Sequence, residues 1–203
     1  MFKNLIHIEN SNVKKLLIGR ISTNIADSLF YMTILWYFKV TYHSPMILSL
    51  VFIADSTIDM LAFIFGPLID RVHVKKLFKY VTFSQIILSI LTVCLFFFKQ
   101  QVIILILLVY ILSAIGSTLI YPTEEKILPA IISKTELARV NGLFQMTYRA
   151  LDLFLDALAT VLITYLSLNK TMIISALFFA IALAFYAKLY LPKVLLTKKR
   201  RVF

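Results

Sequence analysis

Long apolar runs constrain this chain more than any other feature of its sequence. The hydrocarbon core of a bilayer is about 30 Å thick, so a helix needs about 20 consecutive, mostly apolar residues to cross it. Several runs of this kind are present, and only short polar segments separate them. We place six predicted spans at residues 16–40, 45–69, 77–98, 102–121, 141–166 and 171–191. The sequence therefore predicts an all-α membrane protein with six transmembrane helices in a single domain, residues 1–203.

The composition favours a membrane protein that is not an enzyme. Hydrophobic residues make up 61% of the chain and charged residues 15%, whereas soluble domains contain about 25% charged residues. The single cysteine, Cys94, excludes a disulfide framework and a cysteine-based metal site. The three histidines are scattered, and no phosphate-binding loop of the form G-x-x-x-x-G-K-[ST] is present. We therefore expect no catalytic site, no metal and no cofactor.

The basic residues indicate membrane topology. The net charge of +11 sits mainly at the ends of apolar runs, without the stacking aromatics of a nucleic-acid surface. With the N-terminus inside, 17 of the 21 Lys and Arg residues lie on the cytoplasmic side, Lys39, Lys99 and Lys170 lie outside, and Arg149 lies within a span. The positive-inside rule then predicts a multi-pass protein of the cell membrane with both termini cytoplasmic, and we expect the lipid bilayer, not nucleic acid, as its partner.

Half of the ten acidic residues lie within the predicted spans. An acid at mid-membrane costs about 2.5–3.5 kcal/mol, so these side chains must face protein, water or a partner rather than lipid. At about 100° per residue, Asp55, Asp59 and Gly66 share one helix face, Gln145, Arg149, Asp152 and Asp156 share another, and Arg20, Asn24, Asp27 and Tyr31 share a third.

Two interpretations of these charges remain open. Arg149 precedes two acids on its own face, so this group can neutralise itself locally and act as a packing seam. The other three acids have no basic partner deep in their own helices, which favours a proton or substrate role. The candidate proton or substrate sites are Asp27, Asp55, Asp59, Arg149, Asp152 and Asp156.

A motif follows the second predicted span. The segment GPLIDRVHVKK, residues 66–76, resembles the cytoplasmic signature loop of the major facilitator superfamily, roughly G-x-L-a-D-r-x-g-r-[RK]-[RK], with His73 and Val74 in place of Gly and Arg. The resemblance implies a gate latch formed by Gly66, Asp70, Arg71, Lys75 and Lys76. We expect Gly66 to permit close helix approach and Asp70 to lie at the N-terminus of the third span, where a carboxylate meets the positive helix end.

A second segment narrows the resemblance. YPTEEKILPAIISKTELARVNGLFQ, residues 121–145, resembles the connection between the fourth and fifth spans of the macrolide-efflux and multidrug exporter branch. The matching residues are Pro122, Leu128, Pro129, Glu136, Leu137, Ala138, Arg139, Asn141, Gly142 and Gln145. The fifth span lacks the Gly-rich run of drug–proton antiporters, so an antiporter mechanism does not follow directly from the motif.

The resemblance implies one six-helix half of a transporter, built from two inverted three-helix repeats. In that architecture spans one and four line a cavity, spans two and five border it and the other half, and spans three and six face lipid. The implied function is ion-coupled export of a small amphipathic or drug-like compound together with a second half or a second copy. The alternatives are a six-span substrate-binding or accessory subunit without its own transport cycle, and an inactive truncated transporter.

Overall fold

Helices account for most of the computed structural model, which describes residues 10–98 and 103–191 apart from the side chains of residues 68, 70, 71, 152 and 153. They are α2 (Ser11–Tyr42), α3 (Pro45–Met60), α4 (Ala62–Arg71), α5 (Val74–Phe96), α6 (Ile103–Ile131), α7 (Lys134–Leu166) and α8 (Leu168–Ala187). Each predicted apolar run contains helix, and the described residues contain no strand. The prediction of an all-α protein is confirmed.

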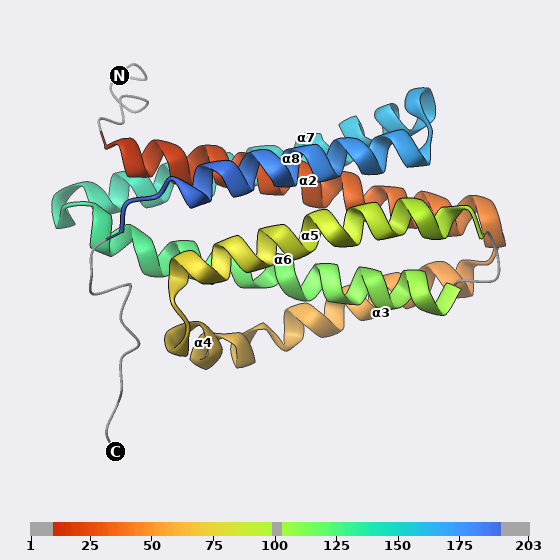
Figure 1. The fold of residues 1–203 in the computed structure, drawn as a ribbon, viewed down its shortest axis with the longest axis horizontal. Helices are drawn as coiled ribbons and strands as arrows, with labels where there is room; N and C mark the ends of the chain where they lie inside the picture. The colour runs from red at the N-terminus through yellow and green to blue at the C-terminus, as the bar shows by residue number, and fades with distance from the viewer. Residues whose placement is uncertain (1–9, 99–102, 192–203) are drawn as a thin grey trace.

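Successive segments run back and forth along one bundle (Figure 1). The start of α2 and the end of α8 therefore lie at the same end, where side chains tie them together. The Asn12 side chain donates to the Tyr190 carbonyl and accepts from the Tyr190 N–H, each at 2.9 Å. The Asn10 amide donates to the carbonyl of Ile131 at 2.6 Å, which joins the same end of the bundle to the end of α6.

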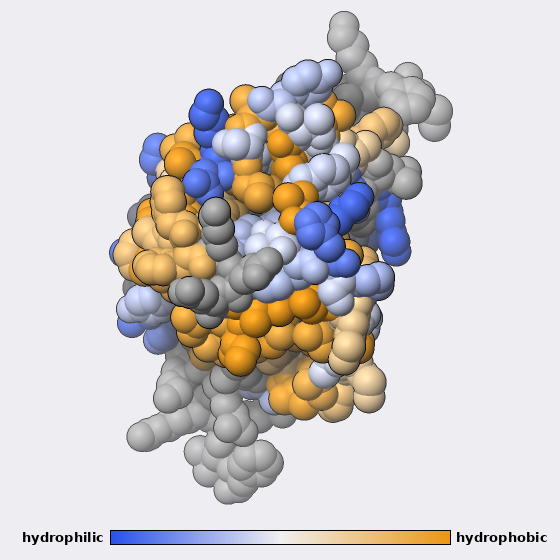
Figure 2. Space-filling view, turned by 90° about the vertical axis from the view of Figure 1, so that its right-hand side faces the viewer, coloured by the Kyte–Doolittle hydropathy of each residue, from blue (hydrophilic) through white to orange (hydrophobic). Residues whose placement is uncertain are grey.

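The bundle has an apolar core, but it also buries polar side chains and exposes many large apolar ones. Three described helices, α5, α6 and α8, are long and apolar enough to cross a membrane. On α5, Gln85 and Ser89 are fully buried while Phe83 and Ile87 are at least half exposed. A lipid environment stabilises this arrangement, because small and polar side chains pack and hydrogen-bond between helices while large apolar ones face hydrocarbon. Seen from the end of the bundle that carries the α2–α3 and α7–α8 turns, apolar side chains cover much of the lower flank (Figure 2).

The second apolar run is divided, contrary to the single span predicted over 45–69. Leu61 separates α3 from α4, and its N–H contacts the carbonyls of Thr57 and Ile58. One turn earlier, the hydroxyl of Thr57 donates to the carbonyl of Ile53 at 2.6 Å. This kind of back-bonding bends helices, and it gives a physical reason for the break.

The polar connection predicted after residue 121 is also corrected. Helix α6 continues through Pro122 and Pro129 to Ile131, and α7 begins at Lys134. A proline lacks the N–H that closes the helical turn, yet neighbouring helices and local hydroxyl groups allow prolines within membrane helices. The extension places Glu124 on a helix in the protein interior, where it is 2% exposed.

A glycine sets the approach of α2 to α8. Tyr186 on α8 is fully buried and stacks on Phe78 of α5, with ring centroids 4.3 Å apart. A Cβ atom built on Gly19 of α2 would lie 2.4 Å from a ring carbon of Tyr186. Any side chain at residue 19 must therefore displace the stacked ring.

We expect Gly19→Ala to destabilise the protein by about 1–3 kcal/mol, the usual cost of overpacking a core. The measurement is the midpoint of thermal unfolding in detergent, followed by size-exclusion chromatography. Gly142→Ala on α7 is the matched control, because a Cβ there meets nothing within 4 Å and alanine is the better helix former by about 1 kcal/mol. Equal midpoints for the two variants would contradict the assigned α2–α8 packing.

A polar cavity as the candidate functional site

A cavity of roughly 580 Å³ lies between α2, α3, α6 and α7. It brings together five of the six candidate residues, Asp27, Asp55, Asp59, Arg149 and Asp156, from helices that are far apart in the sequence. The side chain of the sixth, Asp152, lies outside the described part. Further polar lining comes from Arg20, Asn24, Ser28, Tyr31, Tyr110, Ser113, Ser117, Tyr121, Gln145 and Tyr148.

Asp27 lies at the middle of α2 and is held by a chain of hydrogen bonds that reaches α5. The Ser117 hydroxyl of α6 donates to Asp27 Oδ1. The Gln85 amide of α5 donates to Ser117 Oγ at 2.9 Å and to the Ser113 carbonyl at 2.7 Å. The Ser113 hydroxyl donates back to Gln85 Oε1 at 2.6 Å. The position of the carboxylate is thus set by a helix that does not line the cavity.

Asp55 pairs with tyrosine. The Tyr110 hydroxyl of α6 donates to Asp55 Oδ1 at 2.6 Å. The ring of Tyr31, from α2, lies 6.0 Å from the ring of Tyr110 and is tilted by 36°. One carboxylate and two aromatic rings from three helices therefore share one wall of the cavity.

The α7 side of the cavity is more open. Arg149 and Asp156 are exposed, as is Asp59 on α3. Asp156 accepts a hydrogen bond from Ser28 of α2 at 2.8 Å. Among the side chains that the structure describes, Arg149 forms no ion pair with Asp156. Of the local pairs considered for Arg149, the one with Asp156 is therefore absent.

A buried ion pair closes one end of the cavity. Arg20 Nε of α2 lies 3.5 Å from Glu124 Oε2 of α6, and both side chains are less than 10% exposed. The guanidinium carbon of Arg20 lies 5.0 Å from the ring centroids of both Tyr121 and Tyr148. The Tyr186 hydroxyl donates to Glu124 Oε1 at 3.0 Å. Aromatic faces and a hydrogen bond thus support both partners of the pair, as burial of charge requires.

Sequence reasoning missed Glu124, because the proline at residue 122 was taken as the end of the fourth span. A signal for it existed. Ser113, Ser117 and Glu124 stand at positions i, i+4 and i+11, which fall on one helix face. Extending the face of the serines by two turns reaches the buried acid.

The predicted gate latch is described only in part, because the side chains of Asp70 and Arg71 lie outside the described part. Both residues belong to the last turn of α4, and α5 begins at Val74, so the proximity of Asp70 to the start of the third span stays a prediction. Gly66 is exposed, and a Cβ there meets nothing within 4 Å, so it does not serve a close helix contact within the described residues. Lys75 Nζ donates to the carbonyl of Leu189 at 2.8 Å, and Lys76 is exposed.

The C-terminal end of α4 is contacted by Lys126, which is not one of the predicted gate-latch residues. Lys126 Nζ of α6 donates to the carbonyl of Ile69 at 3.0 Å. Carbonyls in the last turn of a helix lack intrahelical partners, and a cation stabilises them. The observed contact therefore joins α6 to the end of α4.

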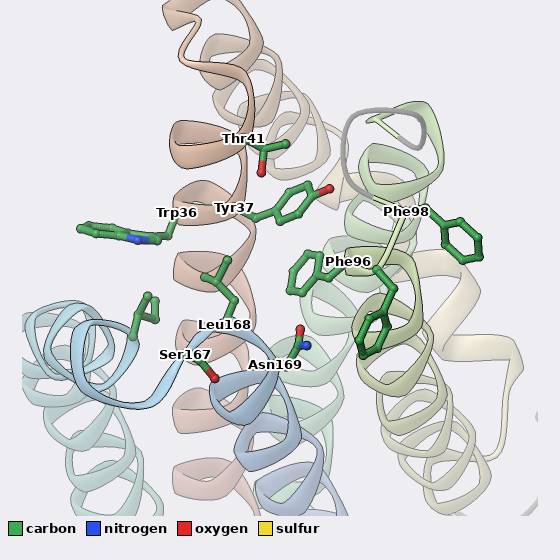
Figure 3. Close-up of a pocket in the computed structure, with 10 residues that line it drawn as sticks. Trp36, Tyr37, Thr41, Phe96, Phe98, Ser167, Leu168 and Asn169 are labelled. Carbon is green, nitrogen blue, oxygen red and sulfur yellow. The ribbon is translucent and has the colours of Figure 1, made fainter.

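A second, larger pocket of roughly 1030 Å³ lies at the end of the bundle that carries the α2–α3 and α7–α8 turns (Figure 3). Trp36 and Tyr37 of α2, Phe96 of α5 and Asn169 of α8 contribute to its wall, and its described lining holds no charged residue. We take the smaller cavity as the candidate site because its charged side chains converge from three helices, α2, α3 and α7. The described residues hold no cluster of His, Cys, Asp or Glu suited to a metal ion.

Comparison with known families decides what kind of chain this is. The sequence profile of the Major Facilitator Superfamily matches residues 16–201. The chain belongs to this superfamily. Searches of curated proteins and of solved structures returned no match. The superfamily consists of transporters rather than enzymes, and together with the apolar helices it indicates a multi-pass membrane protein.

We expect Glu124→Gln and Arg20→Gln each to destabilise the protein by on the order of 3 kcal/mol, since each leaves a buried charge without its partner. The double variant is expected to lose less than the sum, as coupled partners do. Unfolding midpoints in detergent give this cycle. Glu125→Gln is the control, because Glu125 neighbours Glu124 but is exposed. Strictly additive losses would show that the two side chains do not interact.

Proposed function

We propose that this chain is a six-span unit of an exporter that moves a small amphipathic compound by ion-coupled alternating access, together with a second six-helix unit. In this proposal α2, the pair α3–α4, α5, α6, α7 and α8 all cross the cell membrane, with both termini in the cytoplasm. The polar cavity carries the proposal, because it gathers carboxylates from three helices around Asp27 at the middle of α2. Asp27 and Ser117 lie near the midpoints of α2 and α6.

The cavity suits a transported small molecule in size and lining. Ligand pockets commonly enclose about 300–1,000 Å³ and combine apolar walls with a few placed polar groups. Phe30, Ala62, Ala114 and Leu155 supply apolar wall beside the carboxylates. Intramembrane acids mark ion and substrate paths in transporters.

Asp27 is our candidate for the ion-coupling residue. Its single described hydrogen bond comes from a hydroxyl group, so the carboxylate retains acceptor capacity for a proton or a cation. It also lies between the ion pair of Arg20 and the wall formed by Asp55. Binding or release of a proton or cation at Asp27 would therefore change the electrostatic potential at both ends of the cavity.

A second unit is proposed because α3 and α7 expose polar side chains along helices that would cross lipid. Asp59 on α3, and Arg149 and Asp156 on α7, are exposed in the single unit. Each intramembrane charge facing lipid costs about 2.5–3.5 kcal/mol or more. Covering both helices with a second unit removes this cost, and a twofold pair of copies would bury the same surface on each.

We expect Asp27→Asn to lower export at least tenfold while the inserted amount of protein stays unchanged. The measurement is accumulation of a panel of fluorescent amphipathic compounds in cells that lack their own exporters. Glu136→Gln is the matched control, because it makes the same change at an exposed carboxylate in the first turn of α7. Panel accumulation that is identical with and without the wild-type protein would favour a binding subunit that does not transport.

The second unit is tested by crosslinking in native membranes. With Cys94 replaced, we expect Ser56→Cys on α3 and Thr160→Cys on α7 to form crosslinked species, because both residues are exposed near the charged faces. Ile87→Cys on α5 and Leu177→Cys on α8 serve as controls on exposed apolar faces. Crosslinks of equal yield at all four positions would show random collision in the membrane.

A further inference from the structure

We propose that the ligand of the polar cavity is an organic cation with apolar groups around its charge. The proposal takes its site from the function proposed above and names the class of substrate. Its first support is the balance of charge. The described lining holds Asp27, Asp55, Asp59 and Asp156 against Arg20 and Arg149.

The positive side of that balance is weaker than the count suggests. Arg20 is committed to Glu124 at 3.5 Å and lies against two tyrosine rings. Arg149 is exposed and offsets one of the four acids, so the described lining keeps an excess of three acidic groups. The middle of the cavity is therefore negative, and a positively charged ligand offsets it where an anionic ligand would add to it.

Aromatic rings supply the second support, independent of the acids. The Tyr110 hydroxyl donates to Asp55 at 2.6 Å, which places its ring beside the carboxylate. The Tyr31 ring lies 6.0 Å from that of Tyr110. A cation held within about 6 Å of a ring centroid gains from the ring quadrupole, and the gain grows when water is excluded. Rings also suit the apolar groups that surround the charge of an organic cation.

The carboxylates have capacity left for such a ligand. In the described structure Asp27, Asp55 and Asp156 each accept one hydrogen bond, in every case from a neutral hydroxyl group. An ionised carboxylate offers about four acceptor sites. The hydroxyl groups fix the orientation of the acids and bring no positive charge to them. The aromatic pocket of Figure 3 lacks this combination, since no charged residue lines its described wall.

A pair of ions with the same shape and opposite charge tests the proposal. Tetraphenylphosphonium and tetraphenylborate differ in the sign of a charge enclosed by four phenyl rings. With purified protein in lipid nanodiscs and empty nanodiscs as background, equilibrium dialysis should show saturable binding of the cation and none of the anion. We expect Asp55→Asn to weaken cation binding about tenfold and Tyr31→Leu about threefold or more, in line with a desolvated cation–π contact. Glu136→Gln should leave it unchanged.

Each outcome decides the proposal. Equal binding of both ions, preferred binding of the anion, absence of saturable binding, or an unaltered affinity in Asp55→Asn overturns the organic-cation assignment. Size-exclusion profiles of the variants separate lost binding from lost folding, and the conservative Tyr110→Phe variant keeps the ring while removing the hydroxyl. Charge-selective binding without export in the accumulation assay would uphold the ligand class and overturn the transport proposal. Export of neutral compounds only would do the reverse.

Discussion

The carboxamide of Gln85 is the interaction on which the cavity depends. It joins α5 to α6 through both of its polar atoms, and the second serine that it contacts orients Asp27 on α2. Gly116 makes this possible, because a Cβ there would lie 2.8 Å from the Gln85 nitrogen. A buried amide with its partners in place restricts the bundle to one register. Asp27 is therefore positioned by α5, a helix that exposes large apolar side chains on its outer face.

The helices divide into two classes by what they expose. Helices α5 and α8 bury polar side chains such as Gln85 and Ser175 and expose large apolar side chains such as Ile87 and Leu177. Helices α3 and α7 expose charge together with apolar groups, and Phe154 is 71% exposed within a few residues of Asp156. The outer faces of the first class are apolar and suit direct contact with lipid. In the proposed assembly the second class meets polar partners, so the proposed second unit would border the cavity itself.

The sequence predicted the helices and the helix faces that carry the acids. Its failures elsewhere have separate physical causes. Apolar runs report helix length directly, and the spacing of Asp55 and Asp59 reports a shared face. The pairing of Asp55 with Tyr110 could not be predicted, because ten tyrosines are available and the register between helices is set by packing. The break at Leu61 does not coincide with a Gly or Pro, because Gly66 and Pro67 lie within α4. Helix α4 continues to Arg71, two residues beyond the predicted end of the second span, and helix ends commonly differ by this much between sequence and structure.

The joining of Asn12 to Tyr190 has a consequence for how such a unit can be duplicated. Because the chain enters and leaves the bundle at one end, two copies fused in tandem would share the same orientation. The joining peptide would run along one surface and would not have to traverse the apolar layer. A bundle with its ends on opposite sides would invert every second copy or require an added helix. Gene fusion is therefore compatible with this fold without any change to its interior.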